Sequence, residues 1–231
     1  MVDASVGGKT GINFNGLKNE IGAFAPANSV LIETEFLRTL DAYNFFSGYA
    51  EMLKHGLISN TAHWVELLNF NTSNIDYTAL KQLVGQSVQV KENIVEQDPF
   101  EHGIRKALNL GHTVGHAFES MALAEERPVL HGYAVAWGIV CELYLSHLKV
   151  DFPKEKMRQT IQFIKDNYGV FTFDCKKYDQ LYAFMTHDKK NTSGTINFTL
   201  LKDIGDICIN QTADKDTIFE MLDFYRECMG I

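Results

Sequence analysis

The chain of 231 residues lacks several features that assign a protein to a class directly. No apolar run approaches the roughly 20 residues that a membrane-spanning helix needs, so we expect no membrane partner. The first residues, MVDASVGGKT, contain no apolar segment of the kind found in a secretory signal. The net charge is −8 and no long basic run is present, which argues against a nucleic-acid partner.

Closely spaced cysteines are also missing. The four cysteines are far apart and form no CxxC pair: Cys141, Cys175, Cys208 and Cys228. Cysteine-based metal and redox sites are usually recognised by such pairs. We therefore interpret these residues as reduced, mostly buried thiols of a cytoplasmic protein. The apolar fraction of 45% is typical of a globular protein with a real core.

Two common catalytic motifs are absent as well. Residues 3–10 read DASVGGKT, so Asp3 stands where the phosphate-binding motif GxxxxGK[ST] requires its first glycine. Thr113 follows His112, whereas the metalloprotease motif HExxH has its catalytic glutamate at that position. The sequence therefore predicts neither a P-loop nucleotide site nor a metalloprotease.

The densest polar chemistry lies in residues 105–119, which read RKALNLGHTVGHAFE. His112 and His116 are four residues apart, so on a helix both imidazoles share one face. We expect one helix over the whole stretch, with Arg105 and Asn109 on nearly the same face. Buried polar side chains on one helix face are costly without partners, which favours a functional role.

Two glycines, Gly111 and Gly115, each precede one of these histidines. A glycine inside a helix costs about 1 kcal/mol relative to alanine. A pair of glycines at this spacing suggests that another part of the molecule approaches the helix closely.

A third histidine, His131, begins another helical run in the segment LHG. Two histidines and one carboxylate, with a fourth position open, form a common catalytic zinc site. The spacing leaves open which two histidines bind a metal. The alternative is that the pair at positions 112 and 116 is solvated or satisfied within a core.

Hydrophobic periodicity predicts a mainly α fold with a short α/β leader and a β-hairpin near the C-terminus. The leader contains one expected strand, Ser29–Thr34. The hairpin is expected in residues 195–209. The helices expected after the leader are Asn44–Ile58, Asp76–Gln97, His131–Lys149, Pro153–Tyr168, Tyr178–Met185 and Asp214–Met229.

Six cations stand out against the acidic composition: Lys9, Lys18, Lys54, Lys91, Arg105 and Lys189. If they converge, the ligand is anionic and carries a phosphate and a carboxylate. One alternative is that Lys9 and Lys18 lie in a flexible glycine-rich loop. The other is that Lys54 forms an ordinary surface pair with Glu51.

Several motifs together carry a resemblance to a known family: VDASVGGKTGIN, GLKNEIGAF, SGYAEMLKHGLI, LNLGHTVGHAFE, LHGYAVAWG and HDKKN. In this order and at this spacing, they resemble the C-terminal part of 3-dehydroquinate synthase. That family has an NAD-binding domain followed by a helical metal domain. The resemblance implies that residues 1–40 are a remnant of the first domain and residues 41–231 are the metal and substrate domain.

The resemblance also implies a role for individual residues. It assigns Zn2+, or Co2+, to Glu51, His112 and His131, which leaves His116 beside the metal as a phosphate-side or proton-transfer residue. It assigns acid–base or catalytic roles to Glu101, His116 and Lys54, and NAD contacts to Lys18, Phe36 and Thr39. Substrate contacts are implied for Asp3, Lys9, Asn19, Lys91, Arg105, Asn109 and Lys189.

The implied reaction converts 3-deoxy-D-arabino-heptulosonate 7-phosphate to 3-dehydroquinate in the shikimate pathway. It oxidises and later reduces one carbinol with NAD, eliminates phosphate and closes the ring in an aldol step. The resemblance further implies a homodimer. Because little of the NAD domain is present, we expect the isolated chain to bind zinc without turning over substrate.

Three other functions compete with this interpretation. Another sugar-phosphate cyclase would keep zinc and NAD but change the carboxylate contacts made by Lys91, Arg105 and Asn109. A metal-dependent alcohol dehydrogenase would leave Lys9 and Lys189 without a role. A non-catalytic metal-binding module would act only by binding a partner.

Overall fold

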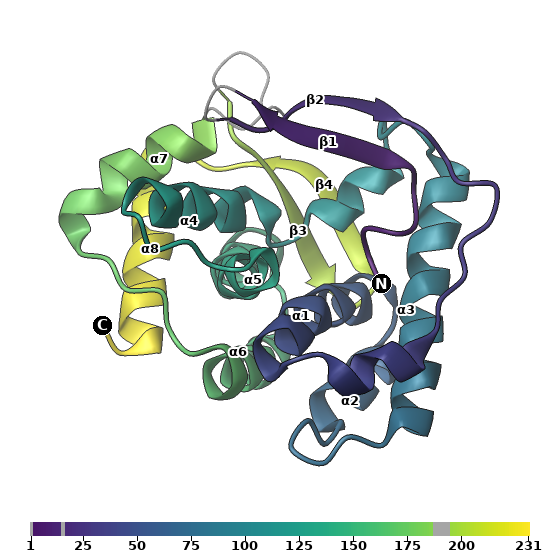
Figure 1. Ribbon diagram of the computed structural model, residues 1–231. Helices are drawn as coiled ribbons and strands as arrows, with labels where there is room; N and C mark the ends of the chain where they lie inside the picture. The colour runs from purple at the N-terminus through teal and green to yellow at the C-terminus, as the bar shows by residue number, and fades with distance from the viewer. Residues whose placement is uncertain (1, 15–16, 187–194) are drawn as a thin grey trace.

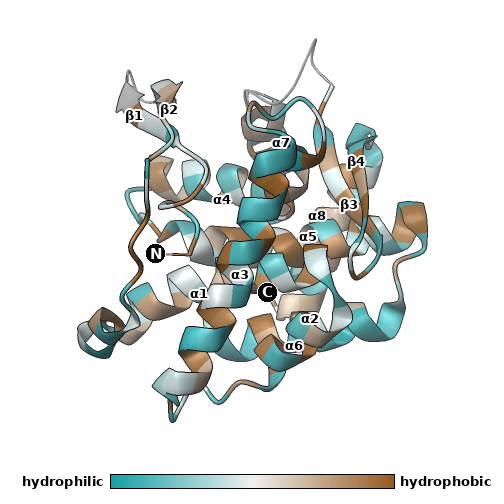
Figure 2. Cartoon of the chain, turned by 90° about the vertical axis from the view of Figure 1, so that its right-hand side faces the viewer, coloured by the Kyte–Doolittle hydropathy of each residue, from teal (hydrophilic) through white to brown (hydrophobic). Residues whose placement is uncertain are grey.

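The leader of the protein is an antiparallel hairpin followed by a short turn of helix. The computed structural model describes residues 2–14, 17–186 and 195–231, without the side chains of residues 13–20. Strand β1 (Lys9–Phe14) pairs with β2 (Leu17–Phe24), with Lys9 opposite Phe24. The 3₁₀ helix η1 (Thr34–Thr39) follows. This hairpin lies at the edge of the molecule in both Figure 1 and Figure 2.

The expected strand over residues 29–34 is wrong. Residues 29–33 form no ladder, and Thr34 already begins η1. Val30 and Leu31 are exposed, and Leu31 is 96% accessible. A β-branched apolar run becomes a strand only when a neighbouring strand accepts its backbone hydrogen bonds, and no strand among the described residues pairs with this run.

The rest of the described chain is a helical body with one hairpin. Its elements, in chain order, are α1 (Ala42–Ser59), α2 (Thr61–Asn69), α3 (Tyr77–Gln97), η2 (Ile104–Asn109), α4 (His112–Ala124), α5 (His131–Val150), α6 (Lys154–Tyr168), η3 (Cys175–Lys177), α7 (Tyr178–Thr186), β3 (Asn197–Asp203), β4 (Asp206–Thr212) and α8 (Lys215–Met229). The predicted mainly α fold and the predicted C-terminal hairpin are confirmed.

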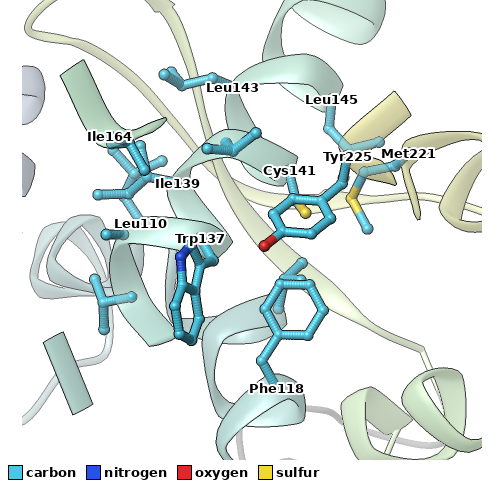
Figure 3. Close-up of a cluster of buried hydrophobic side chains, with 14 of the residues drawn as sticks. Leu110, Phe118, Trp137, Ile139, Cys141, Leu143, Leu145, Ile164, Met221 and Tyr225 are labelled. Carbon is cyan, nitrogen blue, oxygen red and sulfur yellow. The ribbon is translucent and has the colours of Figure 1, made fainter. Parts of the chain in front are cut away.

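Helix α5 occupies the middle of this body. Figure 1 views it nearly end-on, and α1, α4, α6, α8 and β3 all pack against it. A helix that is apolar on all sides must be covered on all sides. Its residues Trp137, Cys141 and Leu145 lie in the main core, beside Phe118 of α4 and Tyr225 of α8 (Figure 3). Outer helices such as α3 instead alternate between hydrophilic and hydrophobic residues (Figure 2).

No helix among the described residues is both long enough and apolar enough to cross a membrane.

The single helix expected over residues 105–119 is wrong. Arg105 and Asn109 lie in η2, the chain turns at Leu110 and Gly111, and α4 begins at His112. Gly111 has φ +78°, a conformation that favours glycine. Arg105 and Asn109 therefore do not share a continuous helix face with His112.

The two glycines before the histidines do mark a close approach. A Cβ at Gly111 would lie 2.6 Å from Cγ1 of Ile139, and a Cβ at Gly115 would lie 2.9 Å from the carbonyl oxygen of Ala134. From the opposite side, a Cβ at Gly138 would lie 2.0 Å from the carbonyl oxygen of Gly111. Helices α4 and α5 thus cross with their backbones in contact.

We predict that Gly138→Ala destabilises the fold by about 3 kcal/mol or more, because the new methyl group overlaps the backbone of α4. Gly85→Ala is the matched control. It also replaces a mid-helix glycine, but a Cβ there meets no atom within 4 Å, so we expect a gain of about 0.5–1 kcal/mol. Urea unfolding of both variants measures the difference. Equal stability of the two variants would contradict the close crossing.

Candidate metal centre

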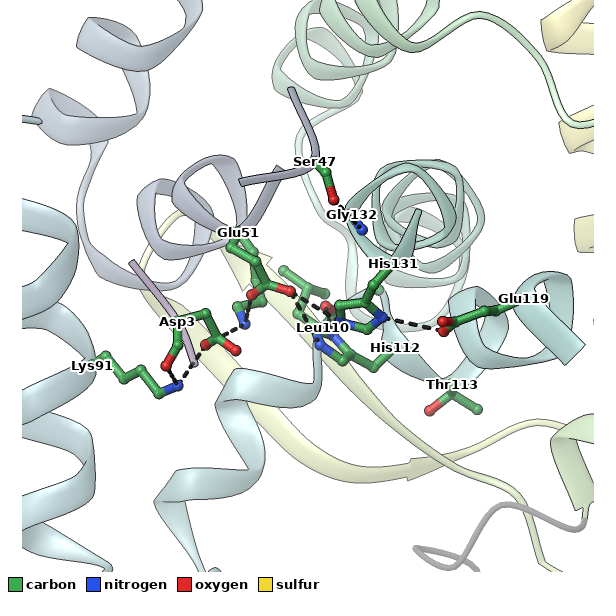
Figure 4. A network of polar contacts seen from close by, with 12 residues as sticks. Asp3, Ser47, Glu51, Lys91, Leu110, His112, Thr113, Glu119, His131 and Gly132 are labelled. Carbon is green, nitrogen blue, oxygen red and sulfur yellow. Dashed lines mark hydrogen bonds and ion pairs between the residues drawn. The ribbon is translucent and has the colours of Figure 1, made fainter. Parts of the chain in front are cut away.

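Three side chains from three helices meet at one point. Glu51 comes from α1, His112 is the first residue of α4 and His131 is the first residue of α5. Their ligand atoms all lie within 4.8 Å of one another. Oε1 of Glu51 is 3.4 Å from Nε2 of His112 and 3.4 Å from Nε2 of His131 (Figure 4).

Hydrogen bonds at Nδ1 fix the tautomer of both imidazoles. Nδ1 of His112 lies 3.0 Å from the carbonyl oxygen of Leu110, and Nδ1 of His131 lies 3.2 Å from Oε2 of Glu119 (Figure 4). Both oxygens accept, so each Nδ1 carries the hydrogen, and in the neutral ring Nε2 then carries the lone pair. Histidine ligands of metals in proteins are commonly oriented in this way.

The carboxylate of Glu51 completes the set. Lys54 donates to Oε2 of Glu51, whereas Oε1 is buried and has no hydrogen-bond donor among the described residues. Burial raises the pKa of Glu51, but the positive charge of Lys54 outweighs burial and holds this pKa well below its usual value. A carboxylate oxygen without a donor that faces two imidazole lone pairs is a costly arrangement, and a divalent cation would relieve it. These residues therefore fit Zn2+ or Co2+.

A chain of opposite charges extends from the metal set toward α3. Nζ of Lys54 lies 3.8 Å from Oδ1 of Asp3, and Nζ of Lys91 lies 2.6 Å from the same oxygen. Burial lowers the pKa of Lys54, but Glu51 and Asp3 outweigh it and leave this pKa above its usual value. Burial also lowers the pKa of Lys91, and Asp3 offsets only part of that effect.

The loop between α3 and η2 carries a second polar group. Glu101 has φ +65°, which is unusual for a residue with a side chain. Lys9 of β1 pairs with one carboxylate oxygen of Glu101, and Nδ2 of Asn109 donates to the other at 2.8 Å. Lys9, which is 92 residues before Glu101, is thus brought beside Glu101 and Asn109.

Arg105 is only 2% exposed and contacts the leader. Its guanidinium donates to the carbonyl oxygen of Gly7 at 2.7 Å and also to that of Pro99, and it lies 5.5 Å from the ring centroid of Phe24. The residue therefore links the leader to the helical body.

The remaining predicted site residues divide into three groups. His116 belongs to the histidine cluster, with its ring centroid 5.4 Å from that of His112 and 5.8 Å from that of His131. Phe36 and Thr39 are exposed on η1. The side chains of Lys18 and Asn19, and the whole of Lys189, lie outside the described residues.

Sequence reasoning missed three residues around the centre. Glu119, which contacts His131, lies one turn after His116, and that spacing could have identified it. Glu142 lies in the core on α5. No sequence pattern indicates its contacts, since its partners are backbone N–H groups at the start of another helix. His55 is fully buried, and neither ring nitrogen has a hydrogen-bond partner among the described residues.

The chain resembles known proteins over its whole length. The family model of the 3-dehydroquinate synthase C-terminal region matches residues 48–191, and the N-terminal model matches residues 1–47. The chain belongs to the 3-dehydroquinate synthase family. A 3-dehydroquinate synthase of Parabacteroides distasonis is 60% identical over 230 residues, and the match covers 100% of this chain and 65% of that protein. The corresponding enzyme of Oceanobacillus iheyensis is 39% identical, over 98% of this chain and 62% of its own length.

Solved structures of related cyclases share the fold. A 2-epi-5-epi-valiolone synthase of Streptomyces hygroscopicus, with NAD+ and Zn2+ bound, has a TM-score of 0.85 and 25% identity over 98% of this chain and 63% of that one. A 2-deoxy-scyllo-inosose synthase, in complex with carbaglucose-6-phosphate, NAD+ and Co2+, has a TM-score of 0.81 and 20% identity. The match covers 98% of this chain and 64% of that one. The chain thus spans slightly less than two thirds of the length of each of these four proteins.

We predict that His55 makes the unfolding free energy fall with acidification. Burial lowers the pKa of His55 to about 3, whereas an unfolded histidine has a pKa of about 6.5. Above pH 6.5 both states are neutral at this residue, and below it only the unfolded chain takes up the proton. His55→Phe should therefore flatten the pH dependence between pH 7 and pH 5 by up to about 1.4 kcal/mol per unit.

Urea unfolding in the presence of a chelator measures this slope without a contribution from bound metal. His102→Phe, at an exposed position, is the matched control and should leave the slope unchanged. Parallel slopes for the parent chain and His55→Phe would contradict the prediction.

Proposed function

We propose that this chain supplies the metal and substrate-binding part of a 3-dehydroquinate synthase. The observation that carries the proposal is the convergence of Glu51, His112 and His131, from three separate helices, within 4.8 Å. In this proposal residues 41–231 are the metal and substrate domain, and residues 1–40 are the end of an NAD-binding domain. The substrate is 3-deoxy-D-arabino-heptulosonate 7-phosphate, and the products are 3-dehydroquinate and phosphate.

Glu51, His112 and His131 would hold Zn2+ or Co2+ in this proposal. The 2-epi-5-epi-valiolone synthase structure contains Zn2+, and the 2-deoxy-scyllo-inosose synthase structure contains Co2+. A bound divalent cation of this kind supplies Lewis-acid polarisation of substrate oxygen atoms. The hydrogen bonds from Nδ1 of the histidines to Leu110 and Glu119 support the assignment, because they keep both Nε2 atoms in the ligating form.

The cations beside the metal set would bind the anionic groups of the substrate. Lys91 and Arg105, with Asn109, are assigned to the carboxylate and ring-hydroxyl side, and Asp3 and Lys54 to substrate hydroxyls. Support for this comes from the burial of Lys54 and Lys91 around a shared carboxylate, since buried ammonium groups need anionic partners. Lys9, Asn19, His116 and Lys189 are assigned to the phosphate side.

Glu101 and His116 are the proposed proton-transfer residues. Lys9 and Asn109 hold the carboxylate of Glu101 from two sides, which limits the orientations it can adopt. His116 is packed among the ligand histidines, so a proton on its ring lies beside the proposed metal. The leaving phosphate is stabilised by the surrounding cations.

NAD contacts are proposed for Lys18, Phe36 and Thr39 in the leader. Phe36 is 74% exposed and Leu31 is 96% exposed, so this segment has apolar surface available for a further domain or a cofactor. A homodimer in the cytoplasm is part of the same proposal and rests on the family resemblance.

A different sugar-phosphate cyclase is the second candidate. The observation that favours it is the fold shared with a 2-epi-5-epi-valiolone synthase at 25% identity. The 60% identity to a 3-dehydroquinate synthase favours the first candidate. A non-catalytic metal-binding module remains as the outcome in which metal binds but no substrate does.

We predict that the dialysed chain retains about one equivalent of Zn2+ and that Glu51→Gln and His112→Gln each lose it, since three protein ligands are the minimum of catalytic zinc sites. Elemental analysis measures the metal. His116→Gln is the matched control and should keep the metal, because its side chain is not assigned as a ligand. If His116→Gln loses the metal and His131→Gln retains it, the histidine ligands are His112 and His116 instead of His112 and His131.

We predict that the chain of 231 residues releases no phosphate from the heptulosonate phosphate in the presence of NAD and Zn2+, because only residues 1–47 match the N-terminal family model. A fusion with the unmatched N-terminal part of the Parabacteroides distasonis relative should restore turnover. Phosphate release is the readout, with sedoheptulose 7-phosphate as the comparison substrate. A fusion that turns over only sedoheptulose 7-phosphate would establish the second candidate instead.

A further inference from the structure

Glu142 is a buried carboxylate that the proposed reaction does not use. It lies on α5, about three turns after His131, and is completely inaccessible to solvent. Both of its carboxylate oxygens point at the first turn of α4. Oε2 accepts from the backbone N–H of Gly111 at 2.7 Å, and Oε1 accepts from those of Thr113 at 3.0 Å and Val114 at 3.2 Å.

This carboxylate replaces a local helix cap. The first N–H groups of a helix have no partner within the helix, and the residue before it usually accepts from them with its side chain. The residue before α4 is Gly111, which has no side chain and whose φ of +78° suits glycine. Glu142 therefore supplies from α5 the acceptors that α4 lacks, and its negative charge suits a helix N-terminus.

The bonds of Glu142 enclose the backbone of His112. Gly111 and Thr113, the residues on either side of that histidine, both donate to Glu142. Nδ1 of the His112 ring is meanwhile held by the carbonyl oxygen of Leu110. With its backbone and its ring both held, His112 directs Nε2 toward Glu51 and His131.

Glu142 also joins two ligand-bearing helices. His112 begins α4 and His131 begins α5, so a bond from α5 to the start of α4 sets the distance between the two ligands. The glycine contacts hold the backbones of these helices together. The three hydrogen bonds of Glu142 add directed contacts at the first turn of α4.

We propose that Glu142 is a positioning residue of the metal centre, which fixes the first turn of α4 so that His112 meets the metal beside His131. This inference rests on the proposed metal site. Glu142→Gln tests it with little change in volume. The carboxamide keeps one acceptor oxygen but turns an NH2 group toward backbone N–H donors, so at least one of the three bonds is lost.

The experiment compares the parent chain with Glu142→Gln and Glu142→Asp. Zn2+ affinity is measured by competition with a chromophoric chelator, the ligand geometry by the visible spectrum of the Co2+ form, and stability by thermal unfolding. We expect both variants to bind Zn2+ about 10- to 100-fold more weakly than the parent, as for other residues that orient metal ligands. The Co2+ bands should also change in position or intensity.

Ser146→Ala is the matched control. Ser146 lies one turn further along α5, is equally buried, donates to the main-chain oxygen of Glu142 at 2.7 Å and accepts from the N–H of Leu201 at 3.1 Å. Its loss should lower the melting temperature without changing Zn2+ affinity or the Co2+ spectrum, because neither bond reaches α4.

Each other outcome overturns the inference in a distinguishable way. Parent-like affinity and spectra in both Glu142 variants, with lowered stability, would make the residue purely structural. Loss of the folded state in both variants would make it a requirement of the core. A parent chain that binds no metal would overturn the proposed metal site itself, and the positioning role with it.

Discussion

The backbone contact between α4 and α5 is the constraint on which the rest of the structure depends. Gly111 and Gly138 bring the two helices so close that a single methyl group at Gly138 would overlap a carbonyl oxygen. Gly132 does the same on the other side of α5, where a Cβ would lie 1.9 Å from the carbonyl oxygen of Ser47 in α1. Because Glu51, His112 and His131 lie on these three helices, the two crossings determine whether their ligand atoms meet.

Several charged side chains of this centre are buried, so each needs a partner of opposite charge. Glu51, Lys54 and Lys91 are each less than a tenth exposed in a protein whose net charge is −8. A buried charge is tolerated only when opposite charges and hydrogen bonds surround it, and Asp3 joins the two lysines for that reason. The leader thus contributes to the charge balance of the helical body, because Asp3 lies before the first strand.

Most helices could be predicted from the sequence because each has a strong apolar period and recognisable ends. Helix α3 begins after the capping residue Asp76, and α6 ends at Tyr168, just before Gly169, as its pattern indicates. The errors have physical reasons. The expected strand at Val30 and Leu31 has no neighbour with which to pair, and the helix expected from Arg105 onward is divided by the left-handed conformation of Gly111. Local propensity describes neither a missing partner strand nor a turn that another helix requires.

The sequence by itself determined the mainly α class, the family and the residue types of the site, since these depend on composition, periodicity and motif spacing. Only the tertiary structure decided how those residues meet. It brought His131 beside His112, linked Glu119 to His131 and left one oxygen of Glu51 facing both imidazoles. It also placed Glu142 against the start of α4. Such contacts join residues that are distant in the chain, and their geometry depends on how the helices cross, which no local pattern encodes.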